Sequence, residues 1–326
     1  MDSIRKYLSY LLRTIKRMRY FPLTIPILDI LNKTLSIFNI YSTFLLQKMD
    51  NAILGFLHQE YGELIEKYLN TPVISFTSES PGTIWTCWWQ GIENAPILVQ
   101  QCIASIHCNA DNHPVVVITW DNLNKYADIP EHIISLAKNG DLSLTHLSDV
   151  LRANLLANHG GQWVDSTMFC LAPLNDALWN ELIFSPVNVI RKKGVNFDSR
   201  GNISWCIWLL MGQKSHPLYC CMDEFYNHFF SKYPIELHYF MTDYFIEVAN
   251  NLLGFFSNQT TNHKSNNPYA IMIDSVNKHF AYNEFPPTHY YKTTYKKDFP
   301  EFAKDGRLTV IGCLTSNSQR LLRGPK

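Results

Sequence analysis

The segment 143–169, SLTHLSDVLRANLLANHGGQWVDSTMF, constrains the fold of this chain more than any other stretch. Its apolar residues recur at intervals of three and four, which predicts an amphipathic helix packed against a core: Leu144, Leu147, Val150, Leu151, Leu155 and Leu156. Gly160 and Gly161 end this helix, because glycine adopts left-handed backbone angles and allows another backbone or a ligand to approach closely. A strand is expected over 162–164. Since an open α/β sheet binds ligands at the carboxyl ends of its strands, we expect Asp165 to point into a ligand site.

The elements around this segment alternate between strands and helices. A strand at 83–87, a helix at 95–108 and a strand at 115–119 predict a βαβ unit. Such alternation indicates a mostly parallel sheet with helices on both faces. Further along we expect a strand at 203–211. The chain after Asn262 is rich in proline, which predicts loops there. The other expected elements are helices at 130–138, 218–233 and 237–253.

Composition and charge exclude several classes of protein. The chain of 326 residues is 46% hydrophobic and 17% charged, as a globular protein would be, and its 28 Lys and Arg balance its 28 Asp and Glu. No overall field attracts a polyanion, so nucleic acid is not an expected partner. The eight cysteines show no C-x-x-C spacing and mostly lie in apolar runs, which argues against a zinc site and favours a reducing, cytoplasmic location.

The N-terminus differs from the rest of the chain. Its first twenty residues set basic side chains against the single acid Asp2, with apolar residues between them, which predicts a basic amphipathic helix: Arg5, Lys6, Arg13, Lys16, Arg17 and Arg19. No small-residue cleavage site follows, so a secretory signal is not expected. Residues 21–46 are apolar, but prolines and polar residues interrupt them before they reach the ~20 residues of a spanning helix.

Two interpretations of this N-terminal arm remain open. It could anchor the protein at the inner face of the plasma membrane, because each basic residue near anionic lipid adds about 1 kcal/mol. It could equally be a helical cap over the rest of the protein, with a solvated charged face. We expect an N-terminal helical segment at 1–78, a connector within 71–82, and the main domain at 79–326.

The central segment resembles a motif of the GT-A glycosyltransferases. These enzymes carry S-D-x-x-R followed by G-G-x-[WY]-x-D-x-D, as in mannosyltransferases of the Och1 type and the large clostridial glucosylating toxins. In particular, the chain is similar to the capsular polysaccharide synthesis protein family, whose second motif reads G-G-x-W-x-D-x-T, matched here by Gly160, Gly161, Trp163, Asp165 and Thr167. Further matches are Ile84, Trp85, Trp88, Trp89, Gln90 and Gly91 upstream and YFMTDYFI at 239–246 downstream.

The resemblance implies a fold and an activity. The fold would be α/β, a GT-A Rossmann-like nucleotide-sugar-binding domain with an added N-terminal helical segment. The activity would be hexosyl transfer from a nucleotide sugar, with a UDP-sugar favoured, to a glycan or lipid-linked saccharide acceptor in the synthesis of capsular or other surface polysaccharide. Related families retain the anomeric configuration, so the resemblance implies retention here.

The resemblance also implies roles for single residues. Asp149 and Arg152 lie three apart on one helix face and would bind the donor sugar, with Arg152 also pairing with Asp165 or a phosphate. Trp85 would stack on the donor base, a contact worth roughly 1–3 kcal/mol in nucleic-acid sites. The alternative for Asp149 and Arg152 is an exposed ion pair worth only ~0.3–0.5 kcal/mol.

A departing nucleoside diphosphate needs positive charge beside it. Many GT-A enzymes supply Mn²⁺ or Mg²⁺ through their D-x-D pair, so Asp165 and Thr167 are the expected metal ligands, although a hydroxyl is a weaker ligand than a carboxylate. The alternative is a lysine in the segment YKTTYKK: Lys292, Lys296 or Lys297. We expect a metal, with Lys297 among the residues that bind the donor.

Asp243 lies in an aromatic stretch, where a carboxylate is unfavourable unless it is paired or faces a cleft. We therefore expect it, with Asp165, to be catalytic and to contact a sugar. It could instead be a helix-surface aspartate or a partner of His238. Two other classes of protein stay open: a non-catalytic glycan-binding or assembly subunit that kept a degenerate GT-A fold, and a membrane adaptor dominated by its N-terminal arm.

Overall fold

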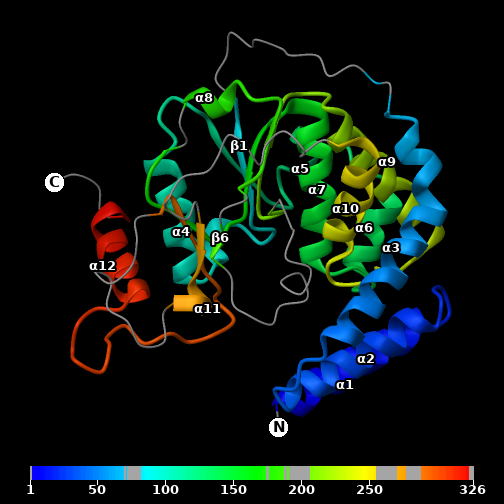
Figure 1. Ribbon diagram of the computed structural model, residues 1–326. Helices are drawn as coiled ribbons and strands as arrows, with labels where there is room; N and C mark the ends of the chain where they lie inside the picture. Colours follow the sequence, from blue (N-terminus) through cyan, green and yellow to red (C-terminus); the bar gives the residue numbers. More distant parts are fainter. Residues whose placement is uncertain are drawn as a thin grey trace.

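The computed structural model describes residues 2–69, 71, 82–173, 176–186, 189–190, 206–254, 270–276 and 288–322. Figure 1 shows a sheet at the centre, helices on its two sides, and a helical hairpin that projects at the N-terminus. The expected mixed α/β class is confirmed. The expected boundary between residues 78 and 79 lies outside the described residues.

The central sheet has five strands in the order β2-β1-β3-β7-β5. β1 is parallel to β2 and β3, whereas β7 is antiparallel to β3 and β5. The expectation of a mostly parallel sheet therefore holds only for the half whose strands are joined by helical crossovers, which parallel pairing requires. The strands are β1 (Ile84–Cys87), β2 (Val115–Ile118), β3 (Gly161–Val164), β5 (Ile183–Phe184) and β7 (Leu209–Gly212).

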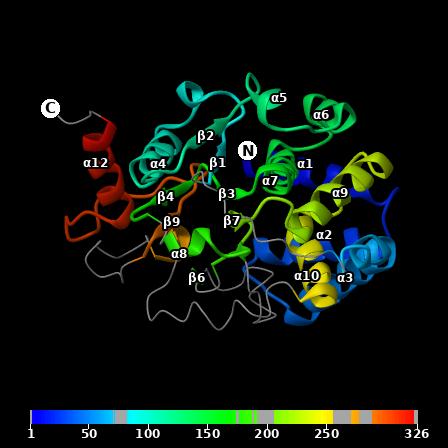
Figure 2. The same cartoon turned by 90° about the horizontal axis from the view of Figure 1, so that it is seen from above.

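Alternate residues of these strands pack on opposite faces of the sheet. Trp85 and Trp163 belong to the core formed with α7 (Leu144–His159), α9 (Pro217–Lys232) and α10 (Met241–Leu253). Ile84 and Val164 belong to a second core, which includes Ile106 of α4 (Ile97–Cys108). Figure 2 shows these two groups of helices on the two sides of the sheet, as the alternation of the sequence predicts. The shorter helices are η1 (Ile92–Asn94), α5 (Leu123–Tyr126), α6 (Glu131–Lys138) and α8 (Asp176–Trp179).

A second sheet has the strand order β4-β9-β8-β6. Its strands at 270–272 and 290–292 come from the part of the chain after Asn262, so the expectation of loops is wrong for these residues, whereas residues 293–309 lie outside the strands and helices as expected. Short strands of this kind are held by pairing with distant strands and leave little local signal. The elements are β4 (Met168–Cys170), β6 (Val189–Ile190), β8 (Ala270–Met272), α11 (Ile273–Val276), β9 (Tyr290–Lys292) and α12 (Val310–Leu322).

Other expected bounds shift by a few residues. The strand expected at 203–211 begins at Leu209, and residues 203–205 lie outside the described chain. The helix expected at 237–253 begins at Met241. α7 begins after Ser143, whose hydroxyl accepts a hydrogen bond from the His146 amide at 3.2 Å, and it ends at Gly160 as predicted.

Three helices precede the first strand, namely α1 (Asp2–Arg17), α2 (Thr24–Ile37) and α3 (Thr43–Glu66). α3 packs against α9 and α10, and its Met49, Ile53 and Leu57 are fully buried in the same core as α7. None of the helices in the described part of the chain is long and apolar enough to cross a membrane.

α1 is joined to the rest of the protein by a buried ion-pair cluster. Glu236 accepts hydrogen bonds from Arg13 Nε and Nη2, both at 2.6 Å, and from Arg17 Nη2 at 2.5 Å. Burial acts to raise the pKa of Glu236, but the hydrogen bond from Arg13 and the charges around it outweigh burial and bring this pKa to about 2. Glu236 is therefore ionised in the folded protein at neutral pH.

Replacing Glu236 by glutamine should destabilise the protein by about 3 kcal/mol at neutral pH. The pKa of Glu236 is depressed, so its contribution is present above the unfolded-state pKa of about 4.5 and is lost as pH falls toward 2. Urea unfolding at several pH values should show that the wild type loses this part of its unfolding free energy in acid, whereas Glu236→Gln does not. The control is Asp141→Asn, whose ion pair with Lys16 is more than a third exposed on both sides and should contribute less than about 1 kcal/mol.

Candidate functional site

A cleft of about 530 Å³ lies at the carboxyl ends of β1 and β3, where the second sheet meets them. We call it the main cleft. Its volume is within the range of about 300–1,000 Å³ that small-molecule sites occupy. Its lining includes several polar, charged and aromatic side chains, namely Trp88, Thr145, Arg152, Asp165, Thr167, Tyr239, Asp274, Lys292, Tyr295, Lys296 and Lys297.

Asp165 follows β3 directly and lies at the centre of a polar cluster, as the sequence predicts. Its Oδ2 accepts a hydrogen bond from Lys292 Nζ at 2.6 Å. Its Oδ1 accepts from Arg152 Nη2 at 3.1 Å and from Trp163 Nε1 at 2.8 Å. Burial acts to raise the pKa of Asp165, but the charges of Lys292 and Arg152 outweigh it, so this pKa lies below its usual value. Asp165 is thus an ionised group with a cation on each oxygen.

Lys292 reaches this cluster from β9. Its Nζ bridges Asp165 Oδ2 and the hydroxyl of Thr167, at 2.6 and 2.7 Å. The pairing of β4 with β9 sets Lys292 opposite Met168, and the amide of Thr293 donates to the carbonyl of Thr167 at 2.8 Å. The strand register therefore holds the lysine at this point.

The expected metal ligands are Asp165 and Thr167, and the residues around them do not fit an ion that bridges these two. The ammonium of Lys292 lies between the two side-chain oxygens, and both carboxylate oxygens of Asp165 accept hydrogen bonds from cationic groups. Mg²⁺ and Mn²⁺ need such oxygens as their own ligands. Within the described ranges no group of three or more His, Cys, Asp and Glu side chains could hold a metal ion. Lys292 supplies the positive charge at this position.

Arg152 is the second cation of the cluster, and its side chain is only 4% exposed. Besides Asp165, its Nη2 lies 3.2 Å from Asp149 Oδ1, and its Nη1 donates to the carbonyl of Ile207 at 2.7 Å. Burial acts to lower the pKa of Arg152, yet the two neighbouring carboxylates raise it overall. The helix spacing thus brings Asp149 and Arg152 together as predicted, but as a buried pair and not as an exposed one.

Asp149 lies behind Arg152 and does not line the main cleft. Its Oδ2 accepts a hydrogen bond from the hydroxyl of Thr242 at 3.0 Å, and Thr242 in turn lies 2.5 Å from the hydroxyl of Tyr226. Burial raises the pKa of Asp149, although the charge of Arg152 opposes this. The structure therefore brings Asp149 to Arg152 and not to the cleft. Thr242 was not among the predicted residues, and its place beside Asp243 in an aromatic stretch was the available signal.

Asp243 lies in the first turn of α10 and is 7% exposed. It is outside the lining of the main cleft, but its charge contributes to the raised pKa of Arg152. It is not on the helix surface, and the carboxylate described beside His238 Nε2 is that of Asp29, at 3.8 Å. Asp243 is thus part of the electrostatic surroundings of the cluster.

The predicted base-stacking residue, Trp85, is buried away from the main cleft. Its indole donates to the carbonyl of Gly160 at 2.9 Å, and its ring packs against Tyr126 and His159. Trp88 lies in the cleft instead, with its ring edge-to-face with Tyr295 at 5.4 Å. Trp88 is the first residue past the carboxyl end of β1, which was the signal that could have identified it.

Gly160 and Gly161 have φ values of 69° and 94°. A Cβ on Gly160 would lie 2.5 Å from the amide nitrogen of Lys214, and one on Gly161 would lie 2.3 Å from the carbonyl oxygen of Thr83. Both positions therefore require glycine, as the sequence predicts. The atoms that approach these two glycines are backbone atoms of Thr83 and Lys214, which lie next to β1 and β7.

Lys296 and Lys297 lie at the rim of the main cleft and are both exposed. Lys297 forms an ion pair with Asp274 of α11, and Lys296 lies over the ring of Tyr295. Of the three lysines weighed from the sequence, Lys292 is the one that contacts Asp165. Asp274 was not predicted, because its stretch was expected to be loop.

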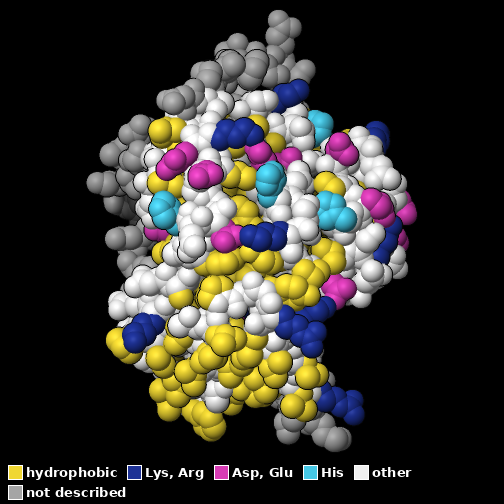
Figure 3. All heavy atoms as spheres, turned by 90° about the vertical axis from the view of Figure 1, so that its right-hand side faces the viewer, with side chains coloured by type: hydrophobic (Ala, Val, Ile, Leu, Met, Phe, Trp, Pro, Cys, Tyr) yellow, Lys and Arg dark blue, Asp and Glu magenta, His cyan; other side chains and the backbone are white. Residues whose placement is uncertain are grey.

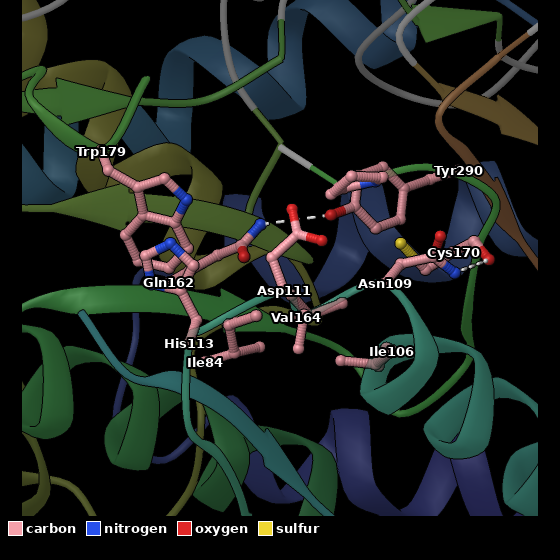
Figure 4. Close-up of a pocket in the computed structure, with 12 residues that line it drawn as sticks. Ile84, Ile106, Asn109, Asp111, His113, Gln162, Val164, Cys170, Trp179 and Tyr290 are labelled. Atoms are coloured by element: carbon pink, nitrogen blue, oxygen red, sulfur yellow. Dashed lines mark hydrogen bonds between the residues drawn. The ribbon is translucent and has the colours of Figure 1, made fainter. Parts of the chain in front are cut away.

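Two further cavities lie near this site. The one in Figure 4, between the sheet and α4, measures only about 10 Å³, which is about the space of one water molecule. The other, which we call the side cavity, measures about 750 Å³ and lies between α1, α2 and the loops before α7 and α10. It shares Thr145, Tyr239 and Lys296 with the main cleft, so the two adjoin.

Comparisons with known proteins identify the family of this chain. No curated protein matches the chain. Among solved structures, the PaToxG glycosyltransferase is similar, with 11% sequence identity and a TM-score of 0.33 over 63% of this chain and 85% of that chain. The sequence profile of the family described as capsular polysaccharide synthesis protein matches residues 34–310. Because this match spans most of the sequence and includes all residues of the Asp165 cluster, the chain belongs to the capsular polysaccharide synthesis protein family.

Proposed function

We propose that this protein is a GT-A glycosyltransferase that transfers a hexosyl group from a nucleotide sugar, with a UDP-sugar favoured, to a glycan acceptor in capsular or other surface polysaccharide synthesis. The cluster of Lys292, Asp165 and Arg152 in the main cleft carries this proposal. Two fixed cations beside an open cleft at the ends of parallel strands suit the diphosphate of such a donor. Family membership agrees with this activity.

In the reaction, the bond from the anomeric carbon to the diphosphate oxygen breaks, and its electron pair leaves with the nucleoside diphosphate. An acceptor hydroxyl oxygen forms the new bond to that carbon and releases its proton. Negative charge therefore grows on the leaving diphosphate. An ammonium group has three N–H donors, and Asp165 and Thr167 are the two acceptors described for Lys292. The third donor would serve a phosphate oxygen.

Arg152, Asp149 and Asp243 have supporting roles in this proposal. Arg152 would hold Asp165, and through it Lys292, in place, and Asp149 would orient Arg152 from behind. The negative charge of Asp243 would help to keep Arg152 protonated. Trp88 and Tyr295 would receive the donor base, and Lys297 would lie at the rim. The transfer would retain the anomeric configuration, as in the retaining families that the chain resembles, and Lys292 and Arg152 would supply the positive charge beside the diphosphate.

The side cavity is the proposed acceptor site. It adjoins the main cleft at Tyr239, which is 54% exposed between the two spaces. His146, in its wall, is buried, and its Nε2 has no hydrogen-bond partner among the described residues. Such a group suits a sugar hydroxyl that enters from the side cavity.

Purified protein should release nucleoside diphosphate from one class of nucleotide sugar, and that nucleotide should raise its melting temperature. Asp165→Asn should lower the release by about 100-fold or more, because Lys292 and Arg152 lose the charge that positions them. Chromatography of the products of UDP-, GDP- and CDP-sugars measures this, with Asp305→Asn, at an exposed ion pair outside the cleft, as the control. A nucleotide-dependent shift without release would favour the non-catalytic glycan-binding or assembly subunit.

A further inference from the structure

Exposed apolar side chains are concentrated on the N-terminal helices. Of the eighteen large hydrophobic residues that are exposed in the described chain, twelve lie between residues 8 and 44. α1 and α2 form an antiparallel hairpin, in which the hydroxyls of Tyr7 and Thr34 lie 2.6 Å apart. Figure 3 shows the resulting surface as a broad apolar area, below a region where charged side chains are mixed. Monomeric soluble proteins rarely expose apolar patches of this kind.

The hairpin has an outer and an inner side. Leu8, Leu12 and Ile15 recur along the exposed side of α1, and Ile27 and Leu31 lie on that of α2, with Leu23 just before it. The inner side of α1 carries Arg13 and Arg17, which bind Glu236. Exposed Phe38, with 69% of its surface accessible, continues the apolar face beyond α2. We call this surface the hairpin face.

Among the described residues up to Lys48, the charged side chains classed as exposed are basic. Arg13, Lys16 and Arg17 pair with acids of the protein, so they are not available to a partner. Exposed basic side chains remain at Arg5, Arg19, Lys33 and Lys48. Asp29, the acid of α1 and α2 whose side chain is described, is turned inward to Arg17. An apolar face with exposed basic side chains beside it suits an anionic bilayer, whereas a second copy of the same face would bring like charges together.

We propose that the hairpin face lies on the surface of an anionic lipid bilayer, with its apolar side chains among the headgroups, and that the acceptor is therefore a lipid-linked saccharide. The second part rests on the proposed function. The same hairpin supplies Arg13, Asn32 and Lys33 to the wall of the side cavity. A saccharide borne on a bilayer lipid would thus meet the side cavity at the membrane surface, next to the main cleft.

Sedimentation with vesicles tests this inference. The protein should bind vesicles of phosphatidylcholine mixed with phosphatidylglycerol more strongly than vesicles of phosphatidylcholine alone, and less strongly at high salt. The double variant Leu12→Glu and Phe38→Glu should bind at least about tenfold more weakly, since both side chains belong to the apolar face. Ile97→Glu, at an equally exposed residue of α4, is the matched control and should bind as the wild type does.

The same variants distinguish membrane binding from dimer formation and from the proposed enzymatic function. Equal binding of the wild type and the double variant, or no binding to anionic vesicles, would overturn it. A dimer in solution that the double variant disperses, without vesicle binding, would assign the face to a second copy. Release of nucleoside diphosphate from a soluble donor, measured without vesicles, should be unchanged in the double variant. Vesicle binding without any such release would refute the proposed function and leave the bilayer surface standing.

Discussion

Replacing Lys292 by methionine should lower donor turnover by roughly 100- to 1,000-fold, the range found when one preorganised charge-stabilising donor is removed. Methionine keeps most of the side-chain volume but supplies no charge to the leaving diphosphate. Asp165 and Thr167 would also lose the ammonium that joins them. Initial rates of nucleoside diphosphate release, at a donor concentration that saturates the wild type, measure the effect.

Two comparisons make this result specific. Lys297→Met should have a smaller effect, because Lys297 is exposed at the rim and pairs with Asp274, and Lys304→Met, outside the cleft, should have none. A chelator such as EDTA should leave the wild-type rate unchanged, because Lys292 holds the position between Asp165 and Thr167. If EDTA abolished turnover and Mn²⁺ restored it, while Lys292→Met kept its rate, the charge would come from a metal and the assignment of Lys292 would be wrong.

Replacing Arg152 by methionine should destabilise the protein by about 3–5 kcal/mol, because it leaves a buried carboxylate without its cation. Asp149 is the group affected most, since its side chain is 5% exposed and burial already raises its pKa. Removing Arg152 raises this pKa further. A carboxyl group with a raised pKa favours the folded state most when it is protonated, below its unfolded-state pKa, and this stabilisation is lost as pH rises through the folded-state pKa. The loss of unfolding free energy in Arg152→Met should therefore be smaller at about pH 5 than at about pH 8.

Urea unfolding of a double-mutant cycle tests this expectation. The double variant Asp149→Asn and Arg152→Met should recover part of the lost stability, because the amide at position 149 carries no charge. Arg307→Met, which breaks an ion pair that is half exposed on both sides, should change stability by less than about 1 kcal/mol. If the double variant were less stable than Arg152→Met, the carboxylate of Asp149 would not be the source of the deficit.

Much of the site was predictable because it is local. The interval between Asp149 and Arg152 sets them on one side of α7, whatever the rest of the chain does. The two glycines mark the sharp turn from α7 to β3, since their φ values are unfavourable for other residues. Asp165 follows the end of a short apolar strand, where ligand sites lie in α/β sheets. These features depend on intervals of a few residues.

What depended on distant contacts was harder to predict. From the sequence, any of Lys292, Lys296 and Lys297 could supply the charge in place of a metal, Lys297 was favoured for binding the donor, and Trp85 was favoured over Trp88 for the donor base. Alternation along β1 buries Trp85 in the core with α7, while Trp88 lies past the strand end and lines the main cleft, so Trp88 is the tryptophan that we propose for the donor base. The second sheet was missed, because its strands after Asn262 are short and pair with partners far along the chain.

In the N-terminal arm, too, the local pattern predicted the helix but not its distant contacts. Its amphipathic pattern predicted a helix with basic and apolar sides, and α1 confirms the helix. Which basic residues face outward could not be read from that pattern, because Glu236, which binds Arg13 and Arg17, lies more than 200 residues away.

The amino-acid sequence by itself thus determined the helix, glycine turn and strand around Asp165, the pairing of Asp149 with Arg152, and the family, since each follows from spacing along a few residues. Only the tertiary structure decided which lysine meets Asp165. Lys292 lies 127 residues from it, and the antiparallel register of β4 with β9 brings its ammonium to within 2.6 Å. A shift of that register by one residue would turn the lysine to the other face of the sheet, because side chains alternate along a strand.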